Sequence, residues 1–99
     1  MTTSSVVTDN RARRRFELDV AGGKAFIDYR RDGSVLTLTY AEVPEHLRGG
    51  GVGAALVEGT LALVRQRGEK VVPQCSFVAA YIAGHPQAQD LLADRPPAR

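Results

Sequence analysis

Apolar and polar residues alternate over the first part of the chain, which is the period of a strand with one buried face. Residues 16–20 and 25–30 show this alternation and are separated by a glycine-containing turn. After an Asp-Gly turn, residues 35–43 are rich in β-branched and aromatic side chains and are followed by Pro44, which cannot donate to a strand ladder. We expect three side chains of this third strand to share one face: Leu36, Leu38 and Tyr40. The pattern predicts a three-stranded antiparallel meander.

After Gly53 the apolar period lengthens to steps of three and four residues, which predicts an amphipathic helix ending at Gly68. Its expected buried stripe comprises Val52, Ala55, Leu56, Gly59, Thr60 and Leu63, widened by Leu61 and Val64. Residues 71–72 predict a short strand, and a strand–helix–strand connection makes it parallel to the third strand. Ser76 is the expected N-cap of a short helix, and a further helical turn is expected over 89–93. The predicted fold class is α+β.

The two ends of the chain lack an apolar period. We expect residues 1–14 to be a flexible basic arm, residues 15–94 to form one domain, and residues 95–99 to be a flexible tail. The arm carries most of an arginine cluster formed by Arg11, Arg13, Arg14 and Arg15. An RNA contact by these arginines is the less favoured interpretation, because no aromatic stacking platform accompanies them.

Composition limits the classes of protein that need to be considered. The hydrophobic fraction of 43% and the charged fraction of 24% are ordinary for a globular domain, and the net charge is +2. No apolar run approaches the roughly 20 residues of a membrane span, so we expect a cytoplasmic protein without membrane contact. A single cysteine cannot form an internal disulfide. The two histidines have no third ligand at a useful spacing, so no metal site is expected.

A glycine-rich turn, Arg48-Gly49-Gly50-Gly51-Val52-Gly53, joins the predicted meander to the predicted helix. The first backbone N–H groups of a helix have no intrahelical partner, and the helix dipole favours negative charge there, so a phosphate is the expected guest. A dinucleotide-binding βαβ unit is excluded because three antiparallel strands precede the glycines. A nucleotide-binding P-loop is excluded because Gly53 is followed by alanine and not by lysine.

The Arg-x-x-Gly-x-Gly pattern between a meander and a helix resembles the GNAT superfamily of acyl-CoA-dependent N-acetyltransferases. The likeness extends to minimal, single-domain GNAT-like proteins known from bacteria, plants and animals. It is carried by Glu42-Val43-Pro44, the glycine turn, Pro73-x-Cys75-Ser76-Phe77-Val78, Tyr81 and His85-Pro86. The resemblance implies a compact GNAT-like fold in which the strands before and after the central helix splay apart.

The resemblance also implies acetyl-CoA or coenzyme A as the bound cofactor, with its pyrophosphate on the glycine turn. The cofactor-binding residues that it implies are Ala41, Val43, Leu47, Arg48, Gly49, Gly50, Gly51, Val52, Gly53, Ala54, Cys75, Ser76, Tyr81 and His85. Backbone N–H groups near Ala41 to Val43 are the expected donors to the oxygen that gains charge during acyl transfer.

Three side chains are candidates for the chemistry. Glu42 is the candidate general base, and the alternative is a rim carboxylate paired with an arginine. Tyr81 is the candidate proton donor to the departing thiolate, and the alternative is an amphipathic aromatic at the edge of the core. Cys75 is the candidate for a covalent acetyl-cysteine, and the alternative is a small packed residue beside the cofactor.

The helices that larger GNAT enzymes insert after their first strand are absent here, so the acceptor side is expected to be open. The sequence therefore predicts an N-acetyltransferase acting on a primary amine by direct attack, as a monomer or weak homodimer. The acceptor is a protein lysine, a polyamine or a metabolite. The alternative is an acyl-CoA-binding or sensing module with little transferase activity.

Overall fold

A computed structural model of the protein describes residues 6–20 and 22–93, and its elements agree with the predicted α+β class. The strands are β1 (Thr8–Asn10), β2 (Arg15–Val20), β3 (Gly23–Asp32), β4 (Val35–Glu42) and β5 (Lys70–Pro73). The helical elements are η1 (Glu45–Leu47), α1 (Val52–Gln66), α2 (Ser76–Ala83) and η2 (Pro86–Leu91), of which η1 and η2 are 3-10 turns.

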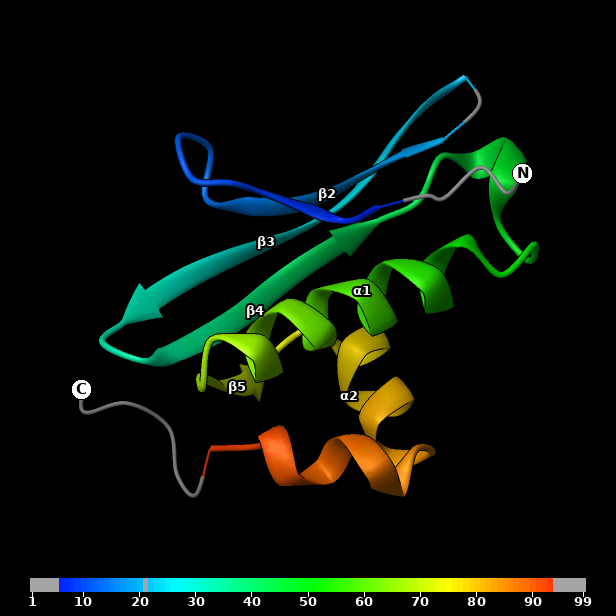
Figure 1. Cartoon of the computed structure of the whole chain (residues 1–99). Helices are drawn as coiled ribbons and strands as arrows, with labels where there is room; N and C mark the ends of the chain where they lie inside the picture. The colour runs from blue at the N-terminus through cyan, green and yellow to red at the C-terminus, as the bar shows by residue number, and fades with distance from the viewer. Residues whose placement is uncertain (1–5, 21, 94–99) are drawn as a thin grey trace.

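The strands form one mixed sheet in the order β1-β2-β3-β4-β5 (Figure 1). Each neighbouring pair from β1 to β4 is antiparallel, and β4 and β5 are parallel. Helix α1 provides the crossover between β4 and β5, as a parallel pair requires. The predicted meander, central helix, parallel strand and short C-terminal helices are therefore confirmed.

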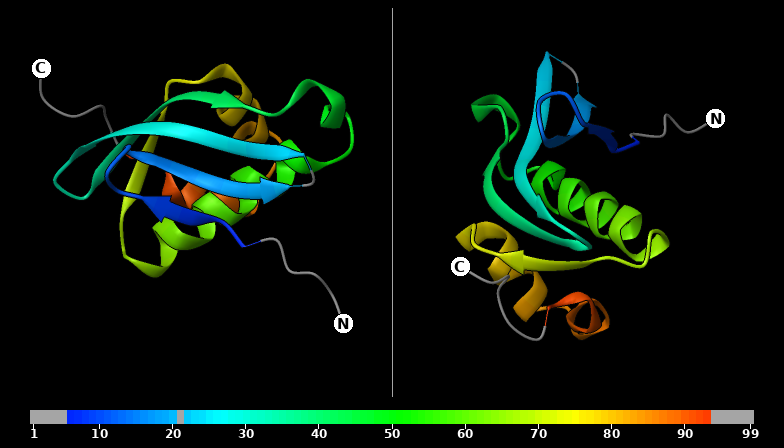
Figure 2. Two further views of the ribbon diagram at one scale, coloured as in Figure 1. Left: turned by 90° about the horizontal axis from the view of Figure 1, so that it is seen from above. Right: turned by 90° about the vertical axis from the view of Figure 1, so that its left-hand side faces the viewer.

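The two helices lie on different parts of the sheet. Helix α1 packs along one face, which we call the inner face, against β2, β3 and β5, and α2 packs near the β4–β5 edge (Figure 2). Side chains from the inner face and the buried side of α1 form the core; the largest that are fully buried include Phe16, Leu18, Ile27, Leu36, Leu38, Leu56 and Val64. In the described part of the chain, no helix lies on the outer face of β2, β3 and the end of β4 (Figure 2).

A β-bulge changes the orientation of the last side chains of β4. The register of β3 with β4 shifts by one residue between Asp28 and Tyr29, which leaves Thr39 as the extra residue in β4. Tyr40 therefore lies on the outer face and is 51% exposed, while Leu36 and Leu38 are fully buried. The prediction that Tyr40 shares a face with these leucines is wrong, because simple alternation fails across a bulge.

The predicted N-terminal arm is wrong for residues 7–14. Strand β1 pairs with β2, and Val7 just before it is only 6% exposed. Next to it in space is Gly59 of α1, where an added Cβ would lie 2.4 Å from Val7 Cγ2. Within β1, Asp9 accepts hydrogen bonds from the Tyr29 hydroxyl at 2.7 Å and from Arg67 Nη1 at 2.8 Å. Residues 1–5 and the predicted tail 95–99 lie outside the described residues.

The buried residues of α1 differ slightly from the predicted stripe. They are Leu56, Val57, Thr60, Leu61 and Val64. Ala55 is exposed and Val57 is buried in the core in its place. Gly68 has a φ of 70°, as expected for the residue after a helix. Helix α2 has Cys75 as its N-cap and not Ser76, and no side chain caps it.

None of the helices in the described part of the chain is long and apolar enough to cross a membrane.

The contact between Gly59 and Val7 predicts a coupled stability effect. A Gly59→Ala variant inserts a methyl group where Val7 lies, so we expect its free energy of unfolding to fall by about 1–3 kcal/mol, offset by about 1 kcal/mol of helix propensity. In a Val7→Gly background the same change meets open space, and only the helix-propensity gain remains. Urea unfolding of the four proteins measures this coupling. Equal effects of Gly59→Ala in both backgrounds would show that β1 does not dock on α1.

Candidate functional site

Strands β4 and β5 separate before β4 ends. Their parallel pairing stops at Leu38 and Pro73, and the Cys75 N–H then donates to the Leu38 carbonyl at 2.9 Å. Beyond this point the chain turns into α2, whereas β4 continues to Glu42. No described strand pairs with residues 39–42 on the side away from β3. The end of β4 therefore presents an open backbone edge, which agrees with the expected splaying of the two strands.

The glycine turn connects this open edge to α1. Gly49 and Gly51 have φ values of 86° and 87°, a region that disfavours any side chain with a Cβ. The first hydrogen bond of the helix runs from the Ala55 N–H to the Gly51 carbonyl at 3.0 Å, and no side chain caps the helix. Among the described residues, the N–H groups of residues 52–54 consequently have no acceptor. They form a cradle for an anion at the start of α1.

A cavity of about 550 Å³ lies where the end of β4, the glycine turn and α2 meet. Its lining residues are Tyr40, Ala41, Glu42, Val43, Arg48, Gly49, Gly51, Gly53, Ala54 and Phe77. This volume is typical of a small-molecule site. The structure thus brings most of the predicted turn and strand residues to one cavity. Leu47, Gly50 and Val52 belong to the same segment but do not line it.

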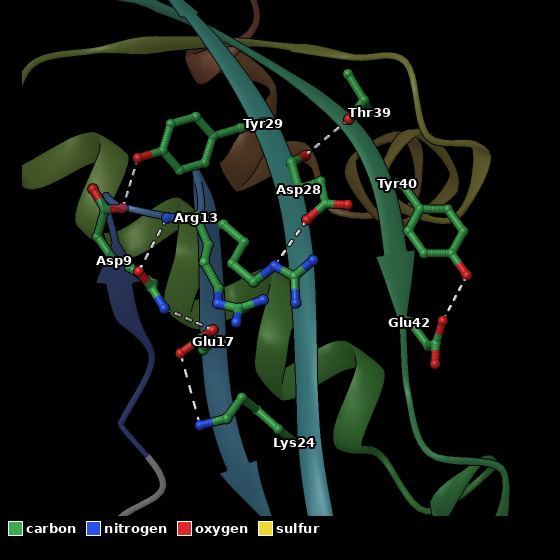
Figure 3. Close-up of polar contacts among 11 residues, drawn as sticks. Asp9, Arg13, Glu17, Lys24, Asp28, Tyr29, Thr39, Tyr40 and Glu42 are labelled. Carbon is green, nitrogen blue, oxygen red and sulfur yellow. Dashed lines mark hydrogen bonds and ion pairs between the residues drawn. The ribbon is translucent and has the colours of Figure 1, made fainter.

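Two charged side chains stand at the cavity. Arg48 donates from Nε to the Val43 carbonyl at 3.1 Å, which ties the turn to the end of β4. Its guanidinium makes no other hydrogen bond and no ion pair among the described residues, so its terminal nitrogens are available to bind a phosphate. Glu42 is exposed and accepts a hydrogen bond from the Tyr40 hydroxyl at 2.6 Å (Figure 3). This hydrogen bond to the carboxylate raises the pKa of Tyr40, so its hydroxyl stays protonated.

Phe77 closes one side of the cavity. Its ring lies so near Gly53 that an added Cβ there would be 2.6 Å from Phe77 Cζ. Glycine at position 53 therefore lets α2 approach the first turn of α1, and the exposed ring of Phe77 forms an apolar wall next to the anion cradle. This is a packing reason for the last glycine of the turn, separate from the positive φ that requires Gly51.

The predicted site residues that follow β5 do not line this cavity. Cys75 is half-buried, packs against the hydrophobic core and ends the β4–β5 pairing, while Ser76 is exposed. Tyr81 stacks on His85 with ring centroids 3.9 Å apart, and His85 Nδ1 lies 2.6 Å from the Tyr81 carbonyl oxygen. None of these four residues lines the cavity.

Tyr81 lines a different hollow of about 690 Å³ along the exposed side of α1, which we call the flank groove. Burial first, and then the charge of Glu58, raise the pKa of Tyr81. The flank groove extends to Val6, Val7 and the η2 segment and contains no glycine turn or free helix N-terminus. Although it is the larger hollow, it offers an anion no cradle of backbone N–H groups.

Sequence reasoning missed two residues that line the cavity. Simple strand alternation predicts Tyr40 on the buried face, and only the bulge at Thr39 turns its side chain toward the cavity. Phe77 was part of the motif that carried the family resemblance but was not assigned a contact. Phe77 reaches the cavity because its ring packs on Gly53, a contact between two elements that local sequence patterns do not reveal.

Among residues 6–20 and 22–93, no group of three or more histidine, cysteine, aspartate or glutamate side chains is placed to hold a metal ion.

Comparison with known proteins agrees with this geometry. Residues 15–91 match the sequence model of the GCN5-related N-acetyl-transferase family. The chain belongs to that family. A GCN5-like candidate N-acetyltransferase from Staphylococcus aureus, whose solution structure is known, shares the GNAT fold with a TM-score of 0.70 and 21% identity. The match covers 99% of this chain and 97% of that chain. No curated protein matches the chain.

The hydrogen bond between Tyr40 and Glu42 predicts a change in titration. A carboxylate next to the hydroxyl opposes its ionisation, so a Glu42→Gln variant should lower the pKa of Tyr40 toward its ordinary value. Asp28 contributes a weaker effect of the same sign and Arg48 an opposing one. An NMR titration of the Tyr40 ring measures the shift, with Asp28→Asn as the control for a more distant charge. An unchanged Tyr40 titration in Glu42→Gln would contradict the contact.

Proposed function

We propose that this GNAT protein binds acetyl-CoA and transfers the acetyl group to a primary amine. The observation that supports this most is a single cavity that joins the free N–H groups at the start of α1 to the carboxylate of Glu42. An anion cradle and a candidate base thus share one space. Acetyl-CoA supplies an activated acyl group as a thioester.

The glycine turn fits the pyrophosphate of the cofactor. The unpaired N–H groups of residues 52–54 point from the start of α1, where the helix dipole adds a favourable field for negative charge. Arg48 adds a full positive charge at the same turn. A side chain on Gly51 would strain the backbone, and one on Gly53 would collide with Phe77. The residues present therefore suit a diphosphate at this place.

The open edge of β4 suits the acyl arm. Because β5 turns away at Pro73, the backbone of residues 39–42 has polar groups available on one side. A pantetheine arm carries amide groups that can pair with such an edge in the manner of an added strand. This would bring the thioester toward Ala41 and Glu42, which line the cavity.

We assign to Glu42 the role of base for the acceptor. An ammonium ion must lose a proton before its nitrogen can attack a carbonyl, and an exposed carboxylate at the cavity can accept that proton directly or through water. In the overall transfer a C–N bond forms, the C–S bond breaks, the attacking nitrogen loses a second proton to water, and the thiolate of CoA gains one. Tyr81 lies in the flank groove, so we assign the last proton to water at the exposed mouth of the cavity.

Direct attack by the amine fits the position of Cys75 better than a covalent acetyl-cysteine. Cys75 packs against the core and is not among the residues that line the cavity. Its backbone N–H instead closes the β4–β5 pairing on the Leu38 carbonyl. We infer that Cys75 contributes by packing at the point where the two strands part.

Alanine variants of two glycines with positive φ test the proposed cofactor site. Gly51→Ala and Gly68→Ala place a methyl group at opposite ends of α1, where φ is 87° and 70° and no neighbour lies within 4 Å. Each should cost about 1–2 kcal/mol of stability through backbone strain. In calorimetric titrations with CoA and acetyl-CoA, we expect only Gly51→Ala to weaken binding, by about tenfold or more. Equal affinities of the two variants, or no binding by the unmodified protein, would reject this cofactor site.

A second pair of variants tests the chemistry. Glu42→Gln removes the proposed base, and its turnover should fall by about 10²–10⁴-fold with little change in acetyl-CoA affinity. Cys75→Ser should retain turnover within the same order of magnitude and sequential kinetics. The assay is mass-spectrometric detection of acetylation in a panel containing a polyamine, a lysine peptide and a small alkylamine. Ping-pong kinetics that are lost in Cys75→Ser would overturn direct attack. CoA binding without turnover of any acceptor would favour an acyl-CoA-binding module.

A further inference from the structure

The outer face of the sheet next to the cavity has an ordered set of side chains. Residues directly opposite one another on neighbouring strands share a face, so the register defines rows across β2, β3 and β4. One row is Arg15, Asp28 and Tyr40, and the next is Glu17, Phe26 and Glu42. We call the two rows together the outer rows. They end at β4 with Tyr40 and Glu42, both of which line the cavity.

Aromatic rings connect the two rows. The ring of Phe26 lies 6.1 Å from that of Tyr40, centroid to centroid, and Arg15 covers Phe26 with its guanidinium carbon 3.8 Å from the ring centre. Phe26 thus already makes a cation–π contact, with Arg15. The ring of Tyr40 is half exposed and carries no such cation among the described residues. It therefore offers the cavity a free aromatic surface backed by a second ring.

The carboxylates of this face differ in their partners (Figure 3). Asp28 pairs with Arg15 at 3.0 Å, and Lys24 pairs with Asp19 at 2.5 Å and with Glu17 at 3.7 Å. Glu42 accepts only the uncharged hydroxyl of Tyr40 among the described residues. Of the three acids in the outer rows, Asp28 and Glu17 each have a cation within 4.0 Å among the described residues, and Glu42 has none. A carboxylate without an ion pair thus lies at the cavity, next to the exposed ring of Tyr40.

We propose that Tyr40 and Glu42 form the acceptor subsite, and that it takes a primary ammonium on an unbranched hydrocarbon stem. This inference rests on the proposed function and adds the class of acceptor to it. The ammonium pairs with the Glu42 carboxylate, and the methylene groups lie over the Tyr40 ring. A carboxylate beside an aromatic face is the combination that attracts an alkylammonium, through charge and through the ring quadrupole. The Phe26 ring, which Arg15 covers, lies beside the Tyr40 ring.

Because the outer face is open, the subsite contacts the ammonium and its hydrocarbon stem but not the rest of the acceptor. Among residues 6–20 and 22–93, no helix covers β2, β3 or the end of β4 on this side, so groups beyond the stem extend into solvent (Figure 2). A branched or ring-bearing carbon next to the nitrogen would collide with the ring or lift the ammonium from Glu42. Affinity for the free amine is therefore modest, because an exposed ion pair and an exposed cation–π contact are each weak.

The test is an NMR titration of the CoA-saturated protein with n-pentylammonium chloride at constant ionic strength. We expect saturable shifts at the Tyr40 ring and the Glu42 backbone amide. Ammonium chloride lacks the stem and 1-pentanol lacks the charge, so each should produce weaker, non-saturating shifts at these positions. Tyr40→Leu should weaken pentylammonium binding by about two- to fivefold, whereas Tyr40→Phe retains the ring and the affinity. Glu42→Gln should weaken it by about two- to fivefold, and the matched change Glu45→Gln outside the cavity should not.

Two results would overturn the proposal. One is an absence of shifts at Tyr40 while CoA still binds, which would reject the acceptor subsite and leave the cofactor site intact. The other is equal binding to Tyr40→Leu and Tyr40→Phe, which would show that the ring does not contact the stem. If CoA itself fails to bind, the proposed function fails first, and this outcome is recognised before any amine is added. Backbone spectra of each variant confirm folding, and Glu42→Gln tests the same subsite without altering a ring.

Discussion

The extra residue at Thr39 decides the chemistry of the cavity, because it reverses the alternation of β4 over its last residues. Without the bulge, Tyr40 would follow Leu36 and Leu38 toward the core, and Glu42 would follow them as well. A buried carboxylate at that position would be costly. With the bulge, both polar side chains reach the outer face, and Ala41 turns inward. One inserted residue thus places a carboxylate and an aromatic hydroxyl at the cavity, while the core stays apolar.

The same region depends on two different properties of glycine. Gly51 allows the backbone to enter α1 with a positive φ, which leaves the first N–H groups of the helix free. Gly53 has an ordinary helical position, and its missing side chain instead makes space for Phe77. The first property creates the anion cradle and the second creates its apolar wall. Arg48 joins both to the end of β4 through the Val43 carbonyl, so the turn and the strand end behave as one unit.

Local patterns predicted most of the fold and the anion cradle from sequence. Alternation, turn chemistry and a 3.6-residue period each depend on neighbouring residues, so the meander, α1 and the glycine turn were recognised. Strand β1 was missed because three residues with a single buried neighbour, Val7, have no visible period; tertiary pairing with β2 and packing on Gly59 order them. The orientation of Tyr40 depends on a bulge that alternation does not reveal. The separation of Tyr81 from the cavity depends on how α2 packs, which a family resemblance alone did not determine.

One edge of the sheet is fixed by side-chain contacts, whereas the strands at the other edge separate. This difference allows a small protein to keep an open site. At the β1 edge, Asp9 bonds Tyr29 and Arg67, and Val7 docks on α1, so the first strand is fixed to both the sheet and the helix. At the other edge, β5 leaves β4 before β4 ends, and the backbone of residues 39–42 lacks a partner strand. An unpaired edge is stable only if the strand is held on its other side, and β3 pairs with β4 up to Glu42. The long β3–β4 ladder therefore lets the end of β4 remain available for a ligand without loosening the sheet.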